Sequence, residues 1–120
     1  MKNLNSTARI IFGIPFLLFG IMHFAFAKGM AGMIPSWLPG GVLWVYVSGA
    51  GLVLASISFF INKMTKLSGL LLALLLLIFI LTLHLPGMAN EATRQMAMTG
   101  LLKDMGLLAG ALMVAANSKE

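Results

Sequence analysis

Long apolar stretches, separated by short polar links, follow one another along the chain. A helix that crosses a bilayer needs about 20 mostly apolar residues. Four stretches meet this requirement, and only the last contains charged residues, Lys103 and Asp104. The predicted spans are residues 10–27, 42–61, 67–85 and 96–116. We therefore predict an all-α fold, a bundle of four transmembrane helices with antiparallel up-down topology that forms one membrane domain over residues 1–120.

The composition also indicates a membrane protein. Charged residues make up 9% of the chain and hydrophobic residues 60%, whereas soluble domains carry about 25% and about 45–50%. The chain contains no cysteine, which excludes disulfide frameworks, thiolate metal sites and thiol relay chemistry. The net charge of +5 is spread between apolar stretches without interleaved aromatic residues, so we predict a lipid bilayer as partner and no nucleic acid.

The distribution of lysine and arginine predicts the orientation. Short loops rich in these residues stay on the cytoplasmic side of a membrane. The N-terminal segment, the middle link and the C-terminus are richer in them than the other two loops: Lys2, Arg9, Lys63, Lys66 and Lys119 against Lys28 and Arg94. We predict a multi-pass protein of the bacterial inner membrane with both termini in the cytoplasm. Trp37, Trp44 and Tyr46 then fall at the outer boundary, where amphipathic rings favour the headgroup level.

The first span has a second interpretation. A basic start, an apolar run and a small-residue pattern such as "AFA" at 25–27 also occur in cleaved signal peptides. The apolar region of a signal peptide has about 7–15 residues, fewer than the run from Ile10 to Ala27, and more spans follow. We interpret the stretch as a span.

Glycines recur along the spans. Gly13 and Gly20 stand on the first span, and Gly100, Gly106 and Gly110 stand on the fourth. Helices in lipid associate by close packing, so we interpret these glycines as contacts between helices. Glycines that line a substrate path are the alternative.

Ionisable residues on three spans reach a similar depth. His23, His84 and Asp104 each lie within about 9 Å of the outer ends of their helices, counted at about 1.5 Å per residue. Adjacent residues on a helix point about 100° apart, so we expect Lys103 and Asp104 to have different partners. Lys103 can extend its stem to the headgroups. Asp104 is expected to turn inward toward His23 or His84, or to meet Lys103 or Arg94 through a bent side chain.

These polar groups have two interpretations. One is a hydrogen-bonded pair that fixes helix packing, and the other is a pocket that binds a ligand or handles protons. Histidine suits the second because it changes its charge near neutral pH. Methionines gather at the same level and would suit Cu(I), but no repeated ligand spacing accompanies them, so we predict no metal site.

Characteristic sequences occur on all four spans and in the first loop. They are "RIIFGIPFLLFGIMHF" from Arg9, "PSWLPG", "WVYVSGAGLVLA" from Trp44, "KLSGLLLALLLLIF" from Lys66 and "LLKDMGLLAGALMVA" from Leu101. Together they resemble the DoxX family of small four-helix membrane proteins. The family takes its name from a subunit of an archaeal thiosulfate:quinone oxidoreductase, and other members act with partner proteins in oxidative-stress defence or, more distantly, as membrane chaperones.

The resemblance implies an accessory or quinone-linked subunit of a membrane redox system. The alternative is a non-enzymatic scaffold or chaperone that binds the helices of a partner protein. Quinone is the implied cofactor, with none bound covalently. A redox partner subunit, another membrane protein or a second copy of the chain is the implied partner. Transport is a third interpretation, but the spans show no inverted repeat.

The predicted ligand site combines polar and aromatic residues near the outer ends of the spans: His23, Trp44, Tyr46, His84, Lys103 and Asp104. Histidine and tyrosine would hydrogen-bond the quinone carbonyls, and Asp104 with a histidine would pass protons. No residue of this chain carries electrons, so a partner would have to supply a flavin, haem or metal. The sequence has no self-contained catalytic motif, and its catalytic residues are unknown.

Overall fold

The computed structural model describes residues 2–32, 36–37 and 39–119, and its regular elements are helices, which confirms the predicted all-α class. In chain order they are α1 (Lys2–Ala25), α2 (Ala27–Ala31), α3 (Val42–Ile61), α4 (Thr65–Phe79), η1 (Ile80–His84), α5 (Leu85–Gly87) and α6 (Arg94–Ala116). The segments α4, η1 and α5 follow one another without a break. The loop motif "PSWLPG" lies partly outside the described residues.

Four helical stretches of the described residues are long and apolar enough to cross a membrane. They are Asn3–Ala25, Val42–Ile61, Thr65–Gly87 and Arg94–Ala116. The second coincides with its predicted span. The first begins and ends earlier than predicted. The third extends further at both ends, and the fourth begins earlier, because residues beside an apolar stretch continue the same helix. By length and composition the chain is a multi-pass membrane protein.

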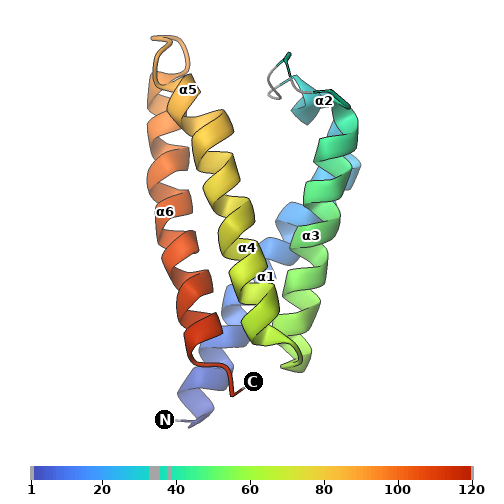
Figure 1. Ribbon diagram of the computed structural model, residues 1–120, viewed down its shortest axis with the longest axis vertical. Helices are drawn as coiled ribbons and strands as arrows, with labels where there is room; N and C mark the ends of the chain where they lie inside the picture. Colours follow the sequence, from blue (N-terminus) through green and yellow to red (C-terminus); the bar gives the residue numbers. More distant parts are fainter. Residues whose placement is uncertain (1, 33–35, 38, 120) are drawn as a thin grey trace.

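The helices form two pairs. α1 packs along α3, α4 packs along α6, and the two pairs meet mainly where α3 contacts α4. Both chain termini lie at one end of the bundle, which we call the terminal end (Figure 1). The α5–α6 loop and α2 lie at the other, the loop end. Toward the loop end the α1/α3 pair and the α4/α6 pair diverge (Figure 1).

Close backbone contact holds α1 against α3. A Cβ atom on Gly20 would lie 3.0 Å from the carbonyl oxygen of Gly49, and one on Gly49 would lie 3.2 Å from the carbonyl oxygen of Gly20. The predicted packing role of Gly20 is therefore confirmed. The prediction is wrong for Gly106, whose Cβ position has no atom within 4 Å, because that face of α6 meets no neighbour.

The apolar core lies between the two pairs. Its buried members are Phe16, Leu52, Ala55, Phe59, Leu72, Ala73, Leu76 and Ala111. The outer faces of all four spans carry exposed Leu, Ile and Met side chains. A helix that is apolar on both its inner and outer faces is typical of a membrane span.

A wide turn interrupts the α-helical pattern between α4 and α5. Over Ile80–His84 the chain forms a π-helix, and the N–H of Leu85 donates to the carbonyl oxygen five residues earlier. Two features favour this turn. The Thr82 hydroxyl donates to the carbonyl oxygen four residues before it at 2.7 Å, a bond that bends helices. Pro86 has no N–H to offer the preceding turn. The turn sets the direction in which His84 leaves the helix.

Candidate functional site

A buried carboxylate lies near the middle of α6. Asp104 is 3% exposed, and it stands ten residues after Arg94, about 15 Å along the helix. His84 Nε2 donates to Asp104 Oδ2 at 2.7 Å, and Lys103 Nζ lies 3.7 Å from Asp104 Oδ1. The expectation that Asp104 turns inward to His84 is confirmed. We call His84, Lys103 and Asp104 the polar cluster.

Lys103 shares its partner with the histidine. The expectation that Lys103 and Asp104 have different partners is wrong, and the alternative that Asp104 meets Lys103 through a bent side chain is confirmed, because the four-carbon stem of lysine is long enough to return to the neighbouring carboxylate. The same ammonium lies 5.1 Å from the centre of the Phe19 ring on α1, which is within cation–π distance. Although its side chain is 52% exposed, Lys103 thereby connects α6 to α1 across the diverging pairs.

Two local features place the His84 ring. The wide turn aims it toward α6, and Gly100 on α6 gives it room. A Cβ atom on Gly100 would lie 2.5 Å from His84 Cε1 and 2.7 Å from His84 Nδ1, so the imidazole packs directly on the bare backbone of α6. Any side chain at this position would displace the ring from Asp104.

His23 stands beside the polar cluster but is not part of it. Its Nδ1 donates to the carbonyl oxygen of Phe19, one turn earlier on α1, at 2.6 Å. Its ring stacks on Phe79, the last residue of α4, with centroids 6.4 Å apart and planes 20° apart. Phe19 and His23 therefore both reach from the α1/α3 pair to the α4/α6 pair. The predicted alternative of a contact between His23 and Asp104 is not formed.

Each histidine has one ring nitrogen engaged by an acceptor. A carbonyl or carboxylate oxygen accepts hydrogen bonds, which assigns the N–H of His23 to Nδ1 and that of His84 to Nε2. In the neutral rings, His23 Nε2 and His84 Nδ1 then carry the lone pairs. Neither atom has a hydrogen-bond partner in the part of the chain that the structure describes. Both can accept a hydrogen bond or a proton from a ligand.

Trp44 and Tyr46, two of the six predicted site residues, lie apart from this cluster. The Trp44 indole N–H donates to the carbonyl oxygen of Pro39, which fastens the loop before α3. The Tyr46 ring stacks on Phe24 with centroids 5.8 Å apart. Among the described residues, no hydrogen bond, ion pair or ring contact joins either to the polar cluster. The structure therefore brings together only part of the predicted set, since apolar helices conceal in sequence which way each face is turned.

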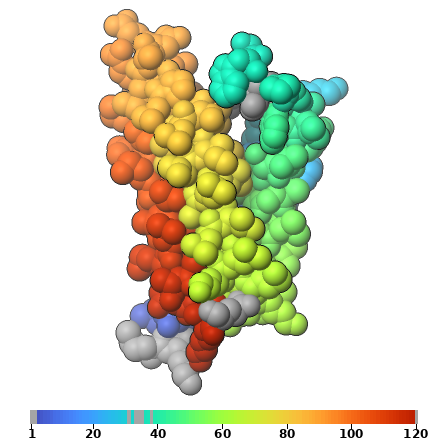
Figure 2. Space-filling model, viewed as in Figure 1, coloured from blue at the N-terminus to red at the C-terminus, as the bar shows by residue number. Residues whose placement is uncertain are grey.

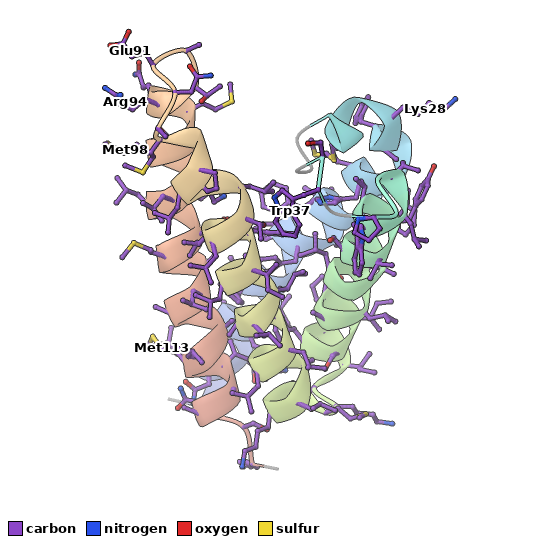
Figure 3. The ribbon with its side chains drawn as sticks, turned by 45° about the horizontal axis from the view of Figure 1, so that its top comes forward. Lys28, Trp37, Glu91, Arg94, Met98 and Met113 are labelled. Atoms are coloured by element: carbon purple, nitrogen blue, oxygen red, sulfur yellow. The ribbon has the colours of Figure 1, made fainter. Side chains whose placement is uncertain are left out.

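The aromatic rings Phe19 and Phe79 were missed at the sequence level. Phe19 could have been found, because it precedes His23 by one helical turn and so shares its face. Phe79 carries no such signal: its position depends on the contact between the two pairs. Figure 3 also shows Trp37 at the loop end, with its side chain between the pairs.

The chemistry available to this site is proton transfer and hydrogen bonding. A carboxylate that accepts from one nitrogen of an imidazole orients the ring and stabilises its protonated form, while the other nitrogen faces a reactant. Within the described residues, no group of three or more His, Cys, Asp or Glu side chains is placed to hold a metal ion.

The four candidate spans, with the polar cluster around the buried Asp104, define a small multi-pass helical membrane protein. Residues 12–115 match the model of a family described as "Domain of unknown function (DUF8561)", and the chain belongs to this family. No curated protein matches the chain, and no solved structure does. The matched range contains all six predicted site residues. The resemblance to the DoxX family, and the ligand-binding role of these six residues, stay predictions.

Proposed function

We propose that this chain is a DoxX-type protein of the bacterial inner membrane that acts as an accessory, quinone-linked subunit of a membrane redox system. One observation carries the proposal: the buried Asp104 holds the His84 ring by one nitrogen, while the other nitrogen has no partner among the described residues. An ionisable side chain at this depth is costly in a membrane and typically marks a functional site.

The surroundings of the polar cluster suit a quinone head group. Such a head group is a flat apolar ring with oxygen atoms on opposite sides. The Phe19 ring offers a flat apolar surface beside Lys103, and the Phe79 ring lies beside His23. The open nitrogens of His23 and His84 can accept hydrogen bonds from the hydroxyl groups of a quinol, and the Lys103 ammonium can donate to the carbonyl oxygen of a quinone.

His84 would handle a proton in this reaction. Oxidation of one quinol releases two protons and two electrons, and the electrons would pass to a flavin, haem or metal on a partner subunit. His84 Nδ1 accepts one of the two protons from a hydroxyl group, and the Nε2–H bond to Asp104 holds the imidazolium that forms in place. In the reverse direction the same imidazolium returns the proton. The open Nε2 of His23 can accept the second proton. This chain thus supplies binding and proton transfer, and its partner supplies electron transfer.

The distribution of charge supports the proposed orientation. Figure 3 shows Lys28, Glu91 and Arg94 at the loop end, with Lys28 directed away from the bundle. Lys63 and Lys66 at the α3–α4 turn, and Lys119 in the tail, lie toward the terminal end. Because the side richer in Lys and Arg faces the cytoplasm, both termini would be cytoplasmic, and the polar cluster would lie in the half of the membrane that faces away from the cytoplasm.

The test is extraction of the protein from its host membrane in a mild detergent, followed by mass spectrometry of its quinones, lipids and proteins. We expect a stoichiometric quinone together with a cofactor-bearing subunit. Asp104→Asn should reduce the quinone content about tenfold, because an amide holds the His84 ring less firmly than a carboxylate does, at a cost of about 1.4 kcal/mol. Helix content, measured by circular dichroism, should be unchanged.

The matched control is Glu91→Gln, the same chemical change at an exposed carboxylate in the α5–α6 loop. It should leave the quinone content as in the wild type. Partner proteins that copurify without quinone, in both the wild type and Asp104→Asn, would contradict the redox proposal.

A scaffold that binds a partner's helix is the second candidate function. It is favoured by the divergence of the two helix pairs, which leaves a hollow on the surface at the loop end between α2 and the α4/α6 pair (Figure 2). A partner's helix inserted there would lie between α2 and the α4/α6 pair. Under this alternative, Asp104→Asn would weaken the association with a copurifying membrane protein, and no quinone would accompany the complex.

A further inference from the structure

A second polar feature lies at the terminal end, away from the polar cluster. A pocket of about 440 Å³ opens between α1, the α3–α4 turn, the end of α6 and the C-terminal tail. Its rim consists of Asn, Ser and Thr side chains together with Arg9 and Lys119. Both charged residues of this lining are basic, so the pocket offers a positive, hydrogen-bonding surface.

Arg9 is held in a fixed position in this pocket. Its Nε–H donates to the carbonyl oxygen of Phe59 at 2.8 Å, in the last turn of α3, where carbonyl groups lack a partner within the helix. The side chain is half-buried. Its two Nη groups form no hydrogen bond or ion pair with any residue that the structure describes. A guanidinium fork held in this way matches two oxygen atoms of a phosphate.

The wall of the pocket toward the membrane interior is apolar. Phe12 on α1 and Met113 and Val114 on α6 line it. A Cβ atom on Gly110 would lie 2.6 Å from Phe12 Cε1. Because Gly110 has no side chain, the Phe12 ring packs close to α6. The lining therefore changes from basic and polar at the end of the bundle to apolar along the helices.

We propose that this pocket binds the phosphate of an anionic phospholipid, with Arg9 and Lys119 on the phosphate and the start of an acyl chain along Phe12, Met113 and Val114. An occupant with a charged head and an apolar stem matches the change in lining. Basic pockets between transmembrane helices are typical sites for such head groups. Free inorganic phosphate shares the head-group chemistry but would leave the apolar wall unused.

The test uses the purified full-length chain, stripped of lipid in dodecyl maltoside. It is titrated separately with phosphatidylglycerol, phosphatidylcholine and inorganic phosphate, and native mass spectrometry counts the bound molecules. We expect one phosphatidylglycerol per chain, bound about tenfold more tightly than phosphatidylcholine, and a higher midpoint of thermal unfolding when it is bound. Arg9→Gln should weaken this binding about tenfold, as expected for loss of one charged hydrogen-bonding group.

Arg9 also contacts α3, so a second variant separates binding from folding. Lys119→Gln changes only an exposed residue of the tail and should weaken phosphatidylglycerol binding in the same direction. The matched control, Lys66→Gln, removes an equal charge from an exposed residue at the same end of the bundle but outside the pocket, and should leave binding unchanged.

Three results would overturn the proposal. Equal affinity for phosphatidylglycerol and phosphatidylcholine would show that the head-group charge is not recognised. Equal losses in Lys66→Gln and Lys119→Gln would show general attraction to a basic surface. Binding of inorganic phosphate that depends on Arg9 and is not displaced by phosphatidylglycerol would assign the pocket to the free anion.

Discussion

Between α1 and α3 the closest contacts join backbone atoms at Gly20 and Gly49, whereas the α4–η1 segment and α6 are also joined by a carboxylate bonded to an imidazole. The α4/α6 pair does not need those polar groups in order to associate. A Cβ atom on Gly69 of α4 would lie 2.9 Å from the carbonyl oxygen of Ala111 on α6, so this pair already has a close backbone contact of its own.

The comparison separates two roles for buried residues. Small residues give both pairs the close packing on which helix association in lipid depends. A buried ion pair contributes little net stability, because the cost of removing charges from water offsets their attraction. By this argument the polar cluster adds little to the association of α6 with the α4–η1 segment, which agrees with the proposed binding role.

The largest effect is expected from Gly20→Leu, which would break the α1/α3 contact. The new side chain would meet backbone atoms of α3 at Gly49 and Val53, which cannot move aside as a side chain can. The free energy of unfolding, measured by denaturant titration in mixed micelles, should fall by about 3 kcal/mol.

Gly106→Leu is the control for this prediction, because the Cβ position of Gly106 has no atom within 4 Å. It should change the free energy of unfolding by less than about 0.5 kcal/mol. Similar losses in the two variants would mean that α1 and α3 are not in close contact.

A smaller effect is expected from variants of His84 and Asp104. The difference in stability between the single and the double variants tests whether these two side chains act as a pair. His84→Leu leaves Asp104 buried with Lys103 alone and should cost about 2 kcal/mol, less than for a wholly unpaired charge. The double variant His84→Leu/Asp104→Leu replaces both polar groups by apolar ones and should be more stable than His84→Leu. The wild type, His84→Leu, Asp104→Leu and the double variant form a double-mutant cycle, measured by the same unfolding titration.

One result of this cycle would contradict the description of His84 and Asp104 as a coupled pair. If the double variant loses the sum of the two single losses, the side chains are not coupled, and the polar cluster is not the unit described above. If the double variant also loses quinone while keeping its stability, the separation of binding from packing is sharpened.

The smallest effect is expected at the bridge between the pairs. Lys103→Gln and Phe19→Leu each remove the cation–π contact, and their coupling energy should be about 0.5 kcal/mol, since Lys103 is half exposed. Lys28→Gln, on the exposed side of α2, is the control for the loss of charge and should show no coupling with Phe19→Leu. Absence of coupling at Lys103 would mean that the cation–π contact does not help to join the pairs.

The fold was predictable because each span is a separate apolar stretch, and the polar links between them are short. Part of the site was predictable as well. Counting residues inward from the predicted ends of the spans brings His84 and Asp104 to similar levels, although α6 begins earlier than predicted and Asp104 lies about 15 Å along it. The cost of a buried carboxylate also requires a partner for it. Such arguments give depth along a helix and the need for a contact.

Rotation about the helix axis could not be obtained in this way. On spans that are apolar on every face, the sequence does not indicate which side meets a neighbour, and this is why Trp44 and Tyr46 were assigned to the site and Phe79 was not. The wide turn before Leu85 changes that rotation again. The reach of Lys103 back to Asp104 depends on the rotamer of a long flexible side chain, which spacing along the helix does not fix.

The wide turn over Ile80–His84 holds one residue more than an α-helical turn of the same kind. Loss of one residue from this turn would restore a regular helix, leave the helices on either side in register and spare the loop that follows. This deletion would change the direction in which His84 leaves the helix. Insertion and deletion, which elsewhere lengthen or shorten loops, can here re-aim a single side chain inside the membrane while the length of every loop stays the same.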